Sequence, residues 1–281
     1  MRLSGRRPAV RVPGAISRVA LRRRTRTGVS AVAAGGLIAG LLLGGAGPSS
    51  AAQAPGAPGQ LPTWAPADKE GFGTSKTSES KVWYTLQNGV MSEVFYPDLG
   101  TPSVRDFQYI VSDGRTFAEK DGEASVHRTR LVDPRALVYE QTNTATSGRW
   151  RLTKTYVTDP DRSTVLTHVE LESLTGAPLQ LYALYNPRLS NSRQAESDDT
   201  GRVSGKALLA QDTTMGTALV SSPAFTATSN GYLGTSDGWQ DLKSDFSMDW
   251  QLDASAGGNL VQTGRIPVTG LPGSTTATVA L

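Results

Sequence analysis

Residues 82–96 read VWYTLQNGVMSEVFY, and this stretch decides the fold class of the chain. Two runs rich in aromatic and β-branched residues flank the pair Asn88–Gly89. A two-residue type I′ turn needs positive φ at both central positions, and Asn-Gly is the pair that best meets this need. The stretch therefore predicts a β-hairpin. A second hairpin is predicted where Asp113–Gly114 separates residues 104–112 from residues 115–120.

Strand-like segments continue at short spacing along the rest of the chain. Residues 163–174 alternate apolar and polar side chains, which predicts an antiparallel strand with one solvated face. Residues 179–185 are apolar on both faces, which predicts a central strand. The other strands that we expect are residues 125–132, 136–142, 149–158, 202–210, 216–221, 224–228, 246–252, 259–268 and 275–281. We expect the last of them near the edge of a sheet.

One short helix is expected at residues 237–244, where Asp237 is a good N-cap and Gln240 takes the third helical position. The expected strands number about fifteen, which is more than one open twisted sheet usually holds. We therefore predict an all-β domain of two large packed sheets.

The N-terminal 54 residues differ from the rest of the chain. They hold nine arginines and no acid, and an uncharged apolar stretch at residues 28–47 is followed by small residues up to Ala54. This order predicts a cleaved signal peptide over residues 1–54 and a secreted protein. The arginines at positions 22–24 suggest twin-arginine export, and Sec export stays open. The alternative is a membrane anchor, since about 20 apolar residues can span a bilayer.

The remaining sequence divides into a short linker and one domain. Residues 55–66, PGAPGQLPTWAP, predict a Pro/Gly/Ala linker, and residues 67–281 predict the β-domain. Outside residues 1–54 the chain carries 19 basic and 25 acidic residues, so a nucleic-acid-binding surface is not expected. The chain has no cysteine, which excludes disulfides, thiol catalysis and cysteine-based metal sites.

Two short motifs resemble catalytic or nucleotide-binding sequences. Residues 234–238, GTSDG, match the G-x-S-x-G nucleophile elbow, but that elbow needs a later histidine, and His127 and His168 both precede it. Residues 201–206, GRVSGK, are one residue short of a phosphate-binding loop and lack its Ser/Thr. We therefore expect ordinary turns at both places.

Other candidate side chains have a structural interpretation that we prefer. His127 and His168 lie on different predicted strands, so they form no local metal motif. Three aspartates recur every four residues around the helix, which indicates a solvated acidic face rather than a Ca²⁺ site. Tryptophans could stack on sugars, but tryptophan in a β-sandwich is more often part of the core. These residues are Asp237, Asp241, Asp245, Trp64, Trp83, Trp150, Trp239 and Trp250.

Several runs, taken together, resemble the N-terminal domain of bacterial glucoamylases and glucodextranases, glycoside hydrolase family 15. The resemblance covers about residues 55–281. Its runs are PGAPG at 55–59 with Trp64, ADK at 67–69, GFGTS at 71–75, VWYTL at 82–86, SEVFYP at 92–97, RDFQYIVSDG at 105–114, Asn186–Pro187, and GYLGTSDGW at 231–239.

The resemblance implies a β-supersandwich of mostly antiparallel strands, similar to galactose-mutarotase-like folds. In that family the domain precedes an (α/α)₆ barrel that carries the catalytic glutamates. This sequence shows no run of amphipathic helices, so we expect the barrel to be missing here. We assign no catalytic, metal or cofactor residue, and we identify no carbohydrate-binding residue.

The expected role is that of a secreted, non-catalytic domain that packs on and stabilises a glycoside hydrolase barrel, with an α-glucan as a further partner. No membrane partner is expected once the signal is cleaved. Two alternatives remain. One is a free carbohydrate-binding module, which needs exposed aromatic side chains. The other is a mutarotase-like enzyme, which needs His127 or His168 and a carboxylate in one pocket.

Overall fold

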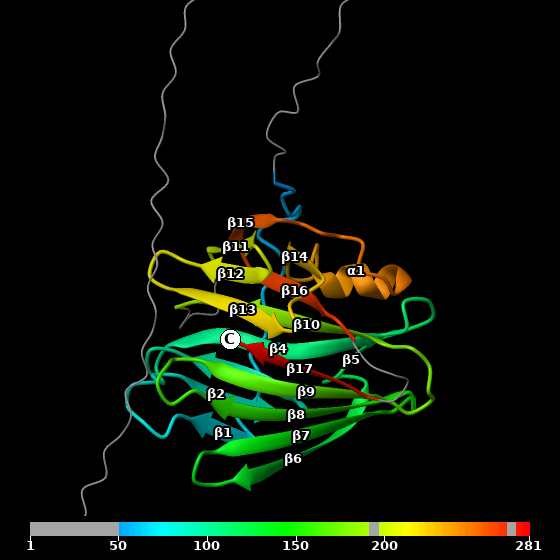
Figure 1. Cartoon of the computed structure of the whole chain (residues 1–281). Coiled ribbons are helices and arrows are strands. Elements are labelled where there is room, and N and C mark those ends of the chain that lie inside the picture. The colour runs from blue at the N-terminus through cyan, green and yellow to red at the C-terminus, as the bar shows by residue number, and fades with distance from the viewer. Residues whose placement is uncertain (1–50, 191–196, 269–273) are drawn as a thin grey trace, which may run out of the picture. The chain divides into compact units, whose positions relative to one another are not determined.

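The computed structural model describes residues 51–190, 197–268 and 274–281, so nearly all of the predicted signal peptide lies outside the described residues. The described part forms two antiparallel sheets and one helix, α1 (Gly238–Asp245) (Figure 1). This is the predicted all-β supersandwich of mostly antiparallel strands with one short helix. Among the described residues, no helix is long and apolar enough to cross a membrane.

The first sheet has eight strands. Its order is β1 (Gly71–Thr74), β2 (Trp83–Gln87), β3 (Val90–Phe95), β4 (Pro102–Ser112), β10 (Gln180–Pro187), β16 (Leu260–Ile266) and β14 (Ala227–Tyr232), and β5 (Ala118–Lys120) pairs with β4 beside this path. The strand expected to be central, β10, lies between β4 and β16 with both faces buried.

The second sheet has nine strands. Its order is β15 (Ala254–Gly258), β11 (Asp199–Ser204), β12 (Ala207–Gln211), β13 (Gly216–Ser222), β17 (Ser274–Ala280), β9 (Val165–Ser173), β8 (Trp150–Thr158), β7 (Val138–Ala145) and β6 (Ser125–Asp133). On β9 the predicted alternation is confirmed, because Val165, Thr167, Val169 and Leu171 are buried while His168 and Glu170 are exposed.

Both predicted hairpins form, with different turns. Asn88 and Gly89 have φ of 50° and 75°, so they make the expected two-residue turn between β2 and β3. The second hairpin pairs Ser112 with Ala118 and therefore has a five-residue loop, longer than the two-residue turn that we predicted. Its loop is held by the Asp113 carboxylate, which accepts the amides of residues 115, 116 and 117.

The helix is confirmed almost to the residue. Asp237 is its N-cap, and the Asp237 carboxylate accepts the amides of Trp239 and Gln240 at 2.9 and 3.0 Å. Phe246, with φ of 73°, ends the helix in the left-handed conformation. Figure 1 shows α1 beside β14 and β16.

Several strand predictions differ from the structure. Of the expected strand at residues 224–228, only the end belongs to a strand, since β14 begins at Ala227. Residues 202–210 are two strands, because Gly205 adopts φ of 61° and turns the chain. Residues 246–252 form a loop, whose apolar Met248 packs beneath α1 instead of entering a ladder. The two short strands β1 and β15 were not predicted, because both are rich in glycine and lack a strand-like pattern.

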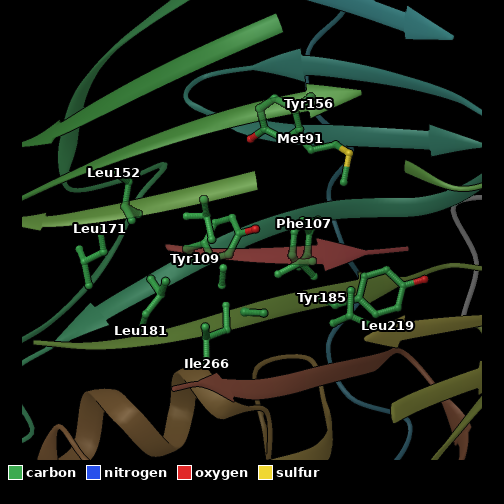
Figure 2. Close-up of a cluster of buried hydrophobic side chains, with 14 of the residues drawn as sticks. Met91, Phe107, Tyr109, Leu152, Tyr156, Leu171, Leu181, Tyr185, Leu219 and Ile266 are labelled. Atoms are coloured by element: carbon green, nitrogen blue, oxygen red, sulfur yellow. The ribbon is translucent and has the colours of Figure 1, made fainter. Parts of the chain in front are cut away.

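The interior between the sheets is a large aromatic and aliphatic core. Figure 2 shows side chains from both sheets meeting there, among them Phe107 and Tyr109 of β4, Tyr185 of β10 and Tyr156 of β8. Phe107 packs edge-on against both Tyr109 and Tyr185, with ring centroids 5.1 and 6.4 Å apart. Such contacts fix side-chain geometry beyond what burial alone provides.

The segment predicted as a linker lies against the domain. Near β15, the Ala54 amide donates to the carbonyl of Ala254 at 2.8 Å. Further along, the Gln60 amide donates to the Leu233 carbonyl, and the Pro58 carbonyl accepts the Asn259 amide, both at 2.8 Å. We call residues 51–66 the N-terminal strap, because they follow the surface of the domain by backbone pairing.

Candidate functional site

The outward face of the eight-stranded sheet carries the candidate site. Along β4 the side chains of Phe107, Tyr109 and Val111 enter the core, so Asp106, Gln108 and Ile110 lie on the opposite face. In the register with β10, Asp106 lies opposite Asn186 and Gln108 lies opposite Leu184. Directly opposed residues of antiparallel strands have neighbouring side chains, so Asp106 and Asn186 form one polar pair.

The apolar part of this face is covered by the helix. Ile110, Tyr182, Leu184 and Val261 of the sheet pack with Leu242 of α1 and with Met248, and Trp239 lies at the border of this cluster. The polar part of the face, around Asp106 and Asn186, borders a cavity instead.

That cavity is a groove with two adjoining compartments of about 500 and 150 Å³. We call the whole of it the sheet groove. Trp64 and the neighbouring strap residues 63–66 line the larger compartment, and Trp239 and Gln240 of α1 line the smaller one. The two compartments share Arg105, Asp106, Gln108, Lys120 and Leu233.

Polar side chains in the sheet groove have hydrogen-bonding capacity to spare. Asn186 is only 4% exposed and Asp106 only 7%. Within the described ranges, the side-chain amides of Asn186 and Gln108 have no hydrogen-bond partner, and Asp106 uses only Oδ2, which accepts from Arg105. None of these polar atoms is among the fully enclosed, unpartnered atoms of the described residues, so they open onto the groove and can bond a ligand there.

The charges of the sheet groove are paired. Arg105 forms an ion pair with Asp106, and its Nε donates to the carbonyl of Thr63 at 2.8 Å, which ties the strap to the groove. Burial lowers the pKa of Arg105, while the nearby carboxylates of Glu93 and Glu123 oppose this effect. Lys120 forms an ion pair with Glu123, and its ammonium lies 4.9 Å from the centre of the Trp239 ring.

A second polar cluster lies at the edge of the same face. The carboxylate of Glu93 is buried and accepts from Thr85 Oγ1 at 2.6 Å, and its Oε2 lies 2.7 Å from Lys69 Nζ. Ser92, which also lines the groove, adds a bond of 3.2 Å to Glu93. All of these contacts go to one oxygen of Glu93, Oε2, so the cluster holds that carboxylate in place beside the groove.

The two histidines lie apart and neither lines the sheet groove. His127 on β6 contacts Glu70, with Nε2 and Oε1 2.8 Å apart, and His168 on β9 faces Thr278 of β17. Burial alone would raise the pKa of Glu70, but bonds from Thr129, His127 and the Asn88 amide together lower it. Because Asn88 and His127 belong to different sheets, Glu70 joins the sheets at one edge. Within the described ranges, no three His, Cys, Asp or Glu side chains gather in a way that could hold a metal ion.

Only one of the three aspartates that we expected on a solvated face is exposed, and that is Asp245. Asp237 and Asp241 are 3% and 1% exposed, and each serves the backbone. Asp237 is the N-cap, and Asp241 Oδ2 accepts the amides of Asp249 and Trp250 at 3.0 and 2.8 Å. Burial raises the pKa of Asp241. Ser236, the central residue of the G-x-S-x-G match, donates to the carbonyl of Pro55 in the strap, so its hydroxyl has a structural role.

The five tryptophans differ in burial, which the sequence alone did not show. Trp150 is fully buried and donates to Glu119 at 2.7 Å. Trp83, Trp64 and Trp239 are half-buried, and Trp250 is 39% exposed. Sequence reasoning included Trp64 and Trp239 among candidates but missed Arg105, Asp106, Gln108 and Asn186. The alternation of β4 gives a shared face for Asp106 and Gln108, but their pairing with Asn186 of β10 is long-range.

The comparisons with known proteins agree on one family. Residues 54–281 match the family model of glucodextranase, domain N. A glucoamylase from Clostridium sp. (strain G0005) is 32% identical over 212 residues, which is 74% of this chain and 30% of that protein. A crystal structure of a bacterial glucoamylase complexed with acarbose matches with a TM-score of 0.75 and 31% identity, over 82% of this chain and 34% of that one. The chain thus spans about a third of the length of these relatives.

Proposed function

Because the chain belongs to the glucodextranase domain N family, we propose that it is the non-catalytic N-terminal β-domain of a glucoamylase-like α-glucan hydrolase, which packs on a catalytic barrel and stabilises it. The observation that carries the proposal is the extent of the match. Nearly all of the described β-domain, but only about a third of each glucoamylase, is shared.

We expect the catalytic barrel, and not this β-domain, to carry out the hydrolysis. In the resembling family, the barrel holds the two carboxylates of glycoside hydrolysis, and such a pair accounts for many orders of magnitude in rate. In this chain the polar side chains that we considered for catalysis serve other contacts, as His127 and Ser236 illustrate. We therefore expect the chain by itself to release no glucose from starch or dextran.

A fusion experiment tests the packing role. Two proteins are compared. In the first, residues 51–281 of this chain replace the homologous β-domain of the Clostridium glucoamylase. The second is the catalytic portion of that glucoamylase without any β-domain. We expect the fusion to hydrolyse soluble starch and to melt at a clearly higher temperature than the catalytic portion alone. As a control, an unrelated β-sandwich fused to the same catalytic portion should not raise its melting temperature. If the fusion with residues 51–281 is no more stable than the isolated catalytic portion, the stabilising role is refuted.

We also propose export of the chain by its N-terminal 54 residues. A reporter enzyme fused to residues 1–54 should appear outside the cytoplasm of a bacterial host, with its N-terminus cut near Ala54. Replacing Arg22 and Arg23 by lysine should block export if the twin-arginine route is used and leave it intact if the Sec route is used. Retention of uncut reporter in the membrane would instead favour an anchor.

A further inference from the structure

We propose that the sheet groove binds a linear α-glucan, with Trp64 and Trp239 packing against sugar rings and the side chains of Asp106, Gln108 and Asn186 bonding their hydroxyls. This inference goes beyond the packing role, because it assigns a ligand site to the β-domain itself.

Polar side chains of the sheet groove have bonding capacity that no described protein group uses. Asn186 is only 4% exposed and faces the groove, yet its amide has no partner among the residues that the structure describes. The side-chain amide of Gln108, on the neighbouring strand β4, also has no partner among the described residues, and neither does Oδ1 of Asp106. An amide carries two donors and an acceptor, and a carboxylate accepts. The three side chains together are suited to a ligand with many hydroxyl groups.

Two tryptophans give the sheet groove apolar surface beside these polar groups. Trp64 lines the larger compartment and Trp239 the smaller one, and both are only half-buried. A pyranose ring has hydroxyls at its rim and C–H groups on its faces. The faces can pack on an indole ring with loss of water from apolar surface, while the rim meets polar side chains. Two tryptophans in adjoining compartments fit successive rings of one chain.

The charges of the sheet groove do not suit an anionic ligand. The cations of the groove, Arg105 and Lys120, are already paired with Asp106 and Glu123. A phosphate or nucleic acid needs unpaired positive charge, and the chain beyond residue 54 carries more acidic than basic residues. A neutral ligand therefore fits best. The volume of the larger compartment, about 500 Å³, lies within the usual range of roughly 300–1,000 Å³ for small-molecule sites.

The choice of an α-glucan rests on the proposed function, because the relatives are glucoamylases. A β-domain that holds part of a glucan would keep the polymer close to the catalytic domain and raise its effective concentration there.

Calorimetric titration of the whole mature chain with maltoheptaose tests this proposal, with cellohexaose as the β-linked control. We expect saturable binding of one maltoheptaose per chain and at least about tenfold weaker binding of cellohexaose. Trp64→Ala and Gln108→Ala should each weaken maltoheptaose binding at least about threefold. Gln108→Ala breaks no side-chain hydrogen bond of the described residues, so its melting temperature should match that of the wild type.

Trp250→Ala is the matched control, because Trp250 is an exposed tryptophan that does not line the groove, and its binding should be unchanged. Absence of saturable binding, equal binding of cellohexaose, or wild-type affinity in both groove variants would overturn the proposal. If both variants bind maltoheptaose like the wild type but stabilise the catalytic domain less in the fusion protein described above, the groove is a protein interface and not a sugar site. The titration uses this chain alone, so its failure is separate from failure of the packing role.

Discussion

At the scale of single residues, a buried ion pair connects the two sheets. Lys154 of β8 and Asp121, which follows β5, have fully buried side chains, and Nζ and Oδ2 lie 2.6 Å apart. Burial lowers the pKa of Lys154, and the attraction of Asp121 opposes this. Asp121 Oδ1 also accepts the backbone amide of Tyr109, so the carboxylate has two tasks.

We predict that Lys154→Met lowers the free energy of unfolding by about 3–5 kcal/mol, because it leaves the Asp121 charge buried without a partner. The double variant with Asp121→Asn should recover part of the loss, since the asparagine keeps an acceptor for Tyr109. Urea unfolding of both variants checks this. A loss below about 1 kcal/mol in the single variant would show that water reaches the pair.

Asp199 of β11 should make stability depend on pH. Burial raises its pKa to about 6, although bonds from Ser197 and the Leu189 amide oppose part of that effect. The folded state then holds the proton more tightly than the unfolded chain, so this contribution is full below about pH 4 and is lost as pH rises through 6. A difference of about two in pKa corresponds to about 3 kcal/mol as an upper limit.

The matching variant is Asp199→Asn, which keeps an oxygen for the amide of Leu189 and cannot ionise. Relative to that of the wild type, its free energy of unfolding should be larger at pH 7 than at pH 4, by on the order of 1–2 kcal/mol, so the variant gains stability at the higher pH. Denaturant titrations at both values measure this difference. A constant difference between the two proteins would mean that Asp199 titrates normally.

At the scale of elements, the turn between β2 and β3 connects local sequence to long-range packing. Gly89 has φ of 75°, and a Cβ at this position would lie 2.4 Å from Asn143 Nδ2. That amide donates to the carbonyl of Gly89 at 3.1 Å and to the carbonyl of Asp121 at 2.9 Å. The hairpin turn of one sheet is thus anchored to β7 of the other.

We predict a loss of about 2–4 kcal/mol for Gly89→Ala, of which about 1 kcal/mol is the cost of positive φ and the rest is the disturbed Asn143 bonds. Gly148→Ala is a suitable control, because Gly148 has φ of 71° and a methyl group added there would meet no atom within 4 Å. Its loss should be about 1 kcal/mol. Equal losses in the two variants, measured by thermal unfolding, would contradict the anchoring role.

The elements predicted correctly are those whose signals are local. The Asn88–Gly89 turn and the Asp237 cap each need only a few neighbouring residues, and both were found from sequence. Residues 246–252 look like a strand because they contain Phe246, Met248 and Trp250. The structure holds them as a loop because Asp241, eight residues or more away from Asp249 and Trp250, accepts their amides. A competing side-chain acceptor of this kind has no periodic signature in the sequence.

At the scale of the whole molecule, the fold class is easier to predict from sequence than the arrangement of the strands. The last strand, which we expected at a sheet edge, is β17, and it lies between β9 and β13 near the middle of the nine-stranded sheet (Figure 1). The candidate site shows the same limit. Asp106 and Asn186 are 80 residues apart in sequence and meet only through the register of β4 and β10.

The N-terminal strap gives the last prediction. It was expected to be a linker, yet the residues around Ala54, Pro58 and Gln60 pair with the backbone of the domain, and Thr63 accepts from Arg105. Each such bond contributes about 0.5–1.5 kcal/mol, and the entropy of ordering the strap offsets a part of the sum. A chain of residues 67–281 should therefore be less stable than one of residues 48–281 by on the order of 2 kcal/mol. For a domain of this size that corresponds to a fall in melting temperature of roughly 4–8 °C, measurable by calorimetry. The shorter chain should also lose any maltoheptaose binding, because Trp64 leaves with the strap. Equal melting temperatures would mean that residues 51–66 act as a tether, whatever contacts they make.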